Sequence, residues 1–141
     1  MKGTVIIIGF FVYVILACFI CWVAILFVDL ETGFIRTRIF WNSFLLLSVC
    51  ILSIVPAAIG YKNKKYGTVA GFFLPFIGGL LVVQVFRTAV NLSSTSKLNF
   101  IFYDAPNIGD YSIILTPIVL SWIIGPFAGG LGELLSKSLQ K

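Results

Sequence analysis

Residues 3 to 28 read GTVIIIGFFVYVILACFICWVAILFV, a segment without a single Asp, Glu, Lys or Arg. An α-helix rises about 1.5 Å per residue, so about 20 apolar residues cross the roughly 30 Å hydrocarbon core of a bilayer. Three further segments, at about 39–60, 67–90 and 112–135, are similarly apolar. We therefore predict an all-α integral membrane protein whose four transmembrane helices form one compact antiparallel bundle, a single domain over residues 1–141.

The composition agrees with this prediction. The 141 residues are 60% hydrophobic and 11% charged, with a mean hydropathy of +1.09. Soluble domains are typically about 45–50% apolar and about 25% charged. Strands of a membrane β-barrel alternate apolar and polar residues over about ten positions, and the runs Val5 to Val12 and Ile113 to Leu120 do not alternate. Little of the chain is left for a soluble domain.

The basic residues predict the topology, because loops rich in Lys and Arg are retained on the cytoplasmic side. With four spans, the N-terminus, the second loop and the C-terminus share one side. That side holds six basic residues: Lys2, Lys62, Lys64, Lys65, Lys137 and Lys141. The other side has no net charge, since it combines Arg36, Arg38, Arg87 and Lys97 with Asp29, Glu31, Asp104 and Asp110. We expect both termini to be cytoplasmic, and orientation and anionic lipid then explain the net charge of +5 without a nucleic-acid partner.

A hexapeptide occurs twice, as PFIGGL at 75–80 and as PFAGGL at 126–131. Proline removes a backbone donor, and glycine tolerates unusual dihedral angles. Two hypotheses follow: either the glycines allow two helices to pack closely, or both helices are interrupted and line a polar site, as in transporters with discontinuous helices. The candidate residues under both hypotheses are Gly71, Pro75, Gly78, Gly79, Gly125, Pro126, Gly129 and Gly130.

The spacing of small residues favours close packing. Small residues four positions apart let two membrane helices approach each other. The third span has Gly67, Gly71 and Gly79 on one broad face, and the fourth span has Ser121, Gly125, Gly129 and Gly132. The segment from Gly125 to Gly129 is a GxxxG pattern, which is typical of packed helices but frequent by chance in glycine-rich segments.

Ionisable residues are absent from the centres of the four spans, and the chain contains no histidine. This argues against a proton pump and against histidine-ligated haem or metal. Gln84 and Arg87 are a possible polar contact near the outer end of the third span. Arg87 could extend to the interface or pair with Asp29 or Glu31. Glu133 lies in the last turn of the fourth span, where we expect an interfacial residue that can pair with Lys137, one turn further on.

Three cysteines lie within the predicted spans. Cys18 and Cys21 form a C-x-x-C pair, but a thiol-shuttling enzyme needs a second pair, and only Cys50 remains. Cysteine is otherwise a common small apolar residue in buried positions. A stripe of small residues in the second span, Ser43, Cys50, Ser53 and Ala57, predicts a face directed toward another helix or, equally, toward a pore.

The longest predicted loop, 91–111, has a polar first half and then the aromatic cluster Phe100, Ile101, Phe102 and Tyr103. Such a cluster favours the headgroup interface or the surface of a partner. We expect no metal site there, since Asp104, Asn107 and Asp110 do not have the spacing of a known calcium loop.

No nucleotide-binding glycine loop, nucleophile elbow, metal-ligand cluster or paired-carboxylate site occurs in the sequence, so we predict no catalytic residue, metal or cofactor. The favoured function is a small non-catalytic accessory or assembly subunit of a larger membrane complex. The alternative is a small oligomeric transporter or channel that uses the Pro/Gly segments, and a remote one is a membrane thiol oxidoreductase. The expected partners are membrane lipids and other membrane subunits or further copies of the chain.

Overall fold

The computed structural model describes residues 2–24, 27–29, 34–35, 38–95 and 108–139. These residues form four helices, α1 (Lys2–Ala24), α2 (Arg38–Asn63), α3 (Gly67–Thr95) and α4 (Ile108–Ser138). Each contains a segment long and apolar enough to cross a membrane, which confirms the four helices expected from the sequence and suggests a multi-pass membrane protein. Two-residue strands, β1 (Val28–Asp29) and β2 (Phe34–Ile35), pair between α1 and α2.

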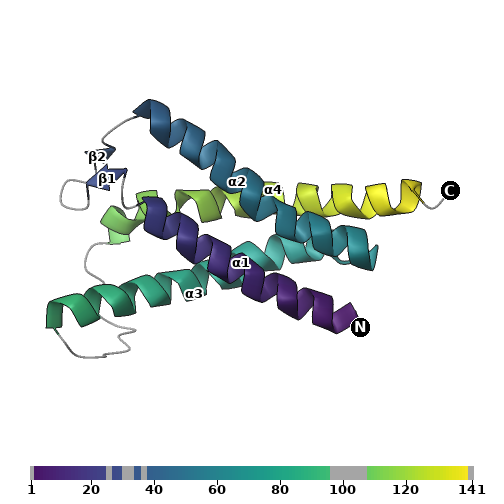
Figure 1. Cartoon of the computed structure of the whole chain (residues 1–141), viewed down its shortest axis with the longest axis horizontal. Coiled ribbons are helices and arrows are strands. Elements are labelled where there is room, and N and C mark those ends of the chain that lie inside the picture. The colour runs from purple at the N-terminus through teal and green to yellow at the C-terminus, as the bar shows by residue number, and fades with distance from the viewer. Residues whose placement is uncertain (1, 25–26, 30–33, 36–37, 96–107, 140–141) are drawn as a thin grey trace.

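The ends of the helices fall into two groups (Figure 1). The start of α1, the turn between α2 and α3, and the end of α4 lie at one end of the molecule. The strand pair, the end of α3 and the start of α4 lie at the other. The lysines at 62, 64 and 65 therefore share an end of the molecule with Lys137, as the sequence predicts.

A tight turn connects α2 to α3. Lys64 has a φ of 62°, in the left-handed region, and its amide donates a hydrogen bond to the carbonyl of Gly60 at 2.8 Å. A residue in this conformation commonly ends a helix and satisfies one of its last carbonyls. The amide of Ala70 then donates to the carbonyl of Tyr66 at 2.8 Å, which begins α3. The turn thus reverses the chain within three residues.

The helix boundaries differ from the apolar runs. α1 ends at Ala24, four residues before the end of the run, because Val28 pairs with Ile35 in the strand pair. α3 continues to Thr95 and α4 begins at Ile108, so both ends of the predicted 91–111 loop are helical. A helix satisfies its backbone hydrogen bonds internally, so it need not stop where the hydrocarbon stops. The aromatic cluster at 100–103 and Asp104 lie outside the described residues.

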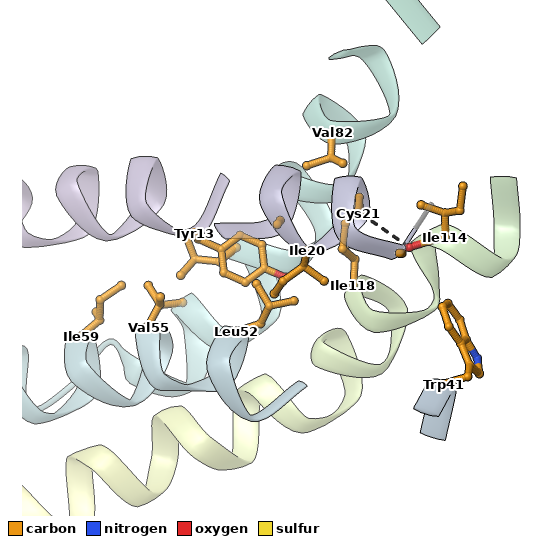
Figure 2. Close-up of a cluster of buried hydrophobic side chains, with 14 residues drawn as sticks. Tyr13, Ile20, Cys21, Trp41, Leu52, Val55, Ile59, Val82, Ile114 and Ile118 are labelled. Carbon is orange, nitrogen blue, oxygen red and sulfur yellow. Dashed lines mark hydrogen bonds between the residues drawn. The ribbon is translucent and has the colours of Figure 1, made fainter. Parts of the chain in front are cut away.

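One face of α1 is buried against the other helices. Its buried residues, Tyr13, Ala17, Cys21 and Ala24, recur at intervals of three or four, as expected for one face of a helix. Figure 2 shows this face packed on side chains of the other three helices. The partners in this core are Trp41, Leu52, Val55, Ile59, Ala70, Leu74, Val82, Ile114 and Ile118.

The opposite face of α1 is equally apolar and exposed: Phe11, Ile15, Phe19 and Trp22 are each more than half exposed. Soluble proteins rarely leave apolar patches of more than a few hundred Å² exposed to water. Hydrocarbon is the solvent that suits this surface. α2 is the most buried of the four helices and α1 the least.

Candidate helix-packing site

The backbones of α2, α3 and α4 come into contact at a group of glycines. We call this set, Gly60, Gly67, Gly71, Gly125 and Gly129, the glycine contact. A Cβ atom added at Gly129 would overlap the carbonyl group of Gly67, and one added at Gly71 would overlap the carbonyl of Gly125. Each of these positions is compatible only with glycine unless the helices move apart.

The pairing has a regular register. Gly67 faces Gly129 and Gly71 faces Gly125, so residue numbers rise by four along α3 as they fall by four along α4. Four residues are close to one helical turn, which keeps both pairs on the same face of each helix. The GxxxG segment of α4 thus lies directly on a matching Gly-x-x-x-Gly segment of α3.

α2 joins the same contact from the other side. A Cβ atom at Gly60 would lie 3.1 Å from the Cα atom of Gly67 and 3.2 Å from the amide nitrogen of Glu133. One turn along α4, a Cβ atom at Gly132 would overlap the carbonyl of Ala57. Three helix backbones therefore meet without intervening side chains.

The carboxylate of Glu133 caps α3. The amide of Thr68, in the first turn of α3, donates a hydrogen bond to Oε1 of Glu133 at 3.0 Å. The first amides of a helix have no partner within the helix, and negative charge is favourable there. This cross-helix cap, rather than the expected ion pair with Lys137, is the contact that the structure shows for Glu133.

Replacing Glu133 with glutamine should lower the stability of the fold slightly, by about 0.5 kcal/mol, because the acceptor remains but its charge is lost. Glu133→Ala removes both and should cost about 1 kcal/mol. Thermal unfolding of the two variants in the same detergent measures the difference. Equal stabilities of Glu133→Ala and wild type would contradict the cap.

The remaining residues of the two hexapeptides do not come together. Gly78 lies against the ring of Tyr13, since a Cβ atom there would be 2.8 Å from its Cδ1 atom. Gly79 faces Ile118, and Gly130 faces the side chain of Thr68. Both α3 and α4 continue as helices through Pro75 and Pro126.

A buried hydrogen bond joins α1 to α4. The hydroxyls of Tyr13 and Ser121 lie 2.6 Å apart, and both residues are almost completely buried. Because the Ser121 hydroxyl donates its one proton to the carbonyl of Ile118 at 2.8 Å, the Tyr13 hydroxyl is the donor between them. This pair was not predicted from the sequence. The only signal in the sequence was a single tyrosine in the apolar first span and a single serine in the apolar run of the fourth.

The thiol of Cys21 forms a second contact between α1 and α4. Its Sγ atom donates to the carbonyl of Ile114 at 3.6 Å, as the dashed line in Figure 2 marks. All three cysteines are free: Cys21 is buried, Cys18 is half-buried and Cys50 is exposed on α2.

We expect a maleimide reagent to distinguish the cysteines. In detergent, Cys50 should be labelled first, and Cys21 should be labelled more slowly by about tenfold or more, because it becomes accessible only when α1 separates from α4. Mass spectrometry of digested protein over a labelling time course measures both rates. Similar rates in folded protein would show that α1 does not pack as described.

For the predicted polar contact between Gln84 and Arg87, the structure describes only the Gln84 side chain. Gln84 is half-buried on α3, and its backbone carbonyl accepts a hydrogen bond from the hydroxyl of Thr88 at 2.8 Å. The side chain of Arg87 lies outside the described part of the chain.

An apolar groove runs between α2 and α4. We call it the α2–α4 groove. Its volume is about 440 Å³, and its walls are formed by Asn42, Leu45, Leu46, Val49, Cys50, Ser53, Leu120 and Ile124. Ser53 is 8% exposed, and its hydroxyl oxygen has no hydrogen-bond partner. The predicted inward stripe of α2 is therefore divided: Ser53 is buried, but Ser43 and Cys50 are exposed.

Within residues 2–24, 27–29, 34–35, 38–95 and 108–139, no group of three or more His, Cys, Asp or Glu side chains is placed to hold a metal ion. Comparisons of the chain with protein-family models, with curated proteins and with solved structures found no match.

Proposed function

We propose that this chain is a small non-catalytic membrane subunit that assembles with a larger membrane complex, and that its four helices form an antiparallel bundle with both termini in the cytoplasm. The paired register of α3 and α4 at Gly67–Gly129 and Gly71–Gly125 supports the antiparallel arrangement. The lysines gathered at one end of the molecule support the orientation.

The observation that carries the proposal is the unpaired hydroxyl of Ser53 in the α2–α4 groove. A buried polar group without a partner costs roughly 1–3 kcal/mol. Lipid tails fill an apolar groove but offer no hydrogen bond. A transmembrane helix of another protein would fill the groove, and once the covered Ser53 side chain turns toward the groove, a polar side chain at this depth would satisfy its hydroxyl, as polar side chains do between membrane helices.

The glycine contact supports a structural role. Close contact of three backbones fixes α2 and α4 relative to each other without flexible side chains, so the groove between them has a fixed shape. A rigid surface loses little entropy on binding, which favours a stable docking face for a partner helix.

Cys50 lies on the groove and provides a test. We suggest attaching a benzophenone maleimide to Cys50 in a Cys18→Ala/Cys21→Ala variant, illuminating native membranes and identifying the adducts by mass spectrometry. The proposal predicts adducts with one or a few other membrane proteins, and fewer adducts after Ser53→Leu fills the groove.

The matched control places the probe on the same helix but outside the groove, by adding Cys50→Ala and Leu47→Cys to the same Cys18→Ala/Cys21→Ala background, since Leu47 is 59% exposed and does not line the groove. This control should give mainly lipid adducts. Adducts from Cys50 with only a second copy of the chain, together with solute transport by the purified protein, would overturn the proposal in favour of an oligomeric transporter.

A further inference from the structure

A second groove, which we call the α1–α3 groove, lies between α1 and α3 and is lined almost entirely by apolar residues. Its volume is about 380 Å³, and residues of the first half of α1 and of the start of α3 line it, among them Ile6, Phe10, Val69, Phe73 and Ile77. Every lining residue is apolar except Tyr66. Unlike the α2–α4 groove, it contains no buried hydroxyl that requires a partner, so a hydrocarbon chain suits it.

Tyr66 marks the end of this groove that lies at the lysine-rich end of the molecule. It is 45% exposed and directly follows Lys64 and Lys65, in the turn between α2 and α3. Tyrosine is favoured where hydrocarbon meets headgroups, because its ring is apolar and its hydroxyl is polar. The groove therefore runs from the membrane interior to the interface, where it meets the turn.

Two of the lysines at this end of the molecule are Lys62, in the last turn of α2, and Lys65, in the connection to α3. Lys62 and Lys65 are exposed. The acidic residues within the four helices are Asp110 and Glu133, one near each end of α4. Asp110 is at the far end of the molecule, and the Glu133 carboxylate already accepts a hydrogen bond from the amide of Thr68. A phosphate group at this turn would thus meet lysines without an acidic competitor on the groove.

We propose that the α1–α3 groove is a binding site for an anionic phospholipid, with one acyl chain along Phe10 and Phe73 and the phosphate at Lys62 and Lys65. An apolar channel that opens beside a basic cluster matches both parts of such a lipid. The apolar channel alone would accept the acyl chain of any lipid, and the basic cluster alone would attract any anion. Only the two together select an anionic phospholipid. The site does not depend on the α2–α4 groove or on its occupant.

The test compares two lipids with identical acyl chains, phosphatidylglycerol and phosphatidylcholine, each with a diazirine on the chain. The full-length protein is reconstituted with trace amounts of either lipid, illuminated and digested, and the adducts are mapped by mass spectrometry. We expect phosphatidylglycerol adducts to concentrate on residues 6–10 and 66–77, at least fivefold above phosphatidylcholine adducts on the same segments. Equal yields, or adducts spread evenly over outward positions such as Phe127 and Leu131, would overturn the proposal.

Charge-removing variants separate a specific site from general attraction to a basic surface. Lys62→Gln/Lys65→Gln should reduce the phosphatidylglycerol yield on the groove to that of phosphatidylcholine. Lys137→Gln removes a charge from the same end of the molecule but on α4, and it should leave the yield unchanged. All three lysines are exposed, so the variants should fold. If Lys137→Gln reduces the yield as strongly as the double variant, the lipid is held by surface charge and the groove is not its site.

Discussion

Gly129→Ala should destabilise this protein by about 3 kcal/mol, far more than the same change at Gly130 or Gly3. The added Cβ atom would overlap the carbonyl group of Gly67, and that group belongs to a backbone that cannot rotate away. Overpacking in ordinary cores costs about 1–3 kcal/mol, and here no side chain can move to absorb it. We expect Gly129→Ala to unfold at a markedly lower temperature in detergent and to give little monodisperse protein.

Gly130→Ala is the matched control, because it makes the same chemical change one position along the same helix. Its Cβ atom would meet only the Oγ1 atom of Thr68, at 3.2 Å, which is the end of an exposed side chain. Gly3→Ala, with no neighbour within 4 Å, provides a second control. Both should unfold close to the wild-type temperature. If Gly129→Ala and Gly130→Ala are equally stable, the three backbones are not in contact as described.

Tyr13→Ala should have the second largest effect. The ring of Tyr13 fills the space between Gly78 on α3 and Ser121 on α4, and glycine at position 78 leaves room for it. Removing a buried aromatic ring costs about 3–5 kcal/mol in soluble cores. In lipid the transfer part of this cost is small and the packing part remains, so we expect a loss of about 2 kcal/mol.

Tyr13→Phe separates the ring from its hydroxyl. It keeps the packing and removes only the hydrogen bond to Ser121, so its cost should be about 0.6 kcal/mol, the average for hydrogen bonds between membrane helices. Thermal or denaturant unfolding, monitored by the labelling of Cys21 as it becomes accessible, measures the stability of both variants on one scale. A larger effect for Tyr13→Phe than for Tyr13→Ala would contradict the packing role.

The helices could be located from the sequence because lipid imposes a length and an absence of charge that residues 3–28 satisfy throughout. Because these residues are apolar on every side of the helix, the sequence does not show which face of α1 is buried. Lipid and protein interior are both apolar, so Phe11, which is exposed, and Ile20, which is buried, cannot be distinguished by hydropathy. Gly71, Gly125 and Gly129 could be identified as candidate packing residues because small residues four positions apart allow two helix backbones to approach closely.

The contacts of polar residues could not be predicted. Glu133 is one turn from Lys137 in the sequence, but its carboxylate reaches the start of α3, which became its neighbour only because the glycine contact brings α3 and α4 so close. Similarly, the position of Ser53 on α2 gives no indication that its hydroxyl is buried without a partner.

The bond between Tyr13 and Ser121 constrains the order of events during synthesis. The two residues are 108 positions apart, so Tyr13 leaves the ribosome well before Ser121 has been translated. Until the fourth helix has been made, the phenol hydroxyl of Tyr13 has no Ser121 to receive its proton. The first helix can pack on α2 and α3 before then, but its hydrogen bond to the last helix forms only when the chain is nearly complete.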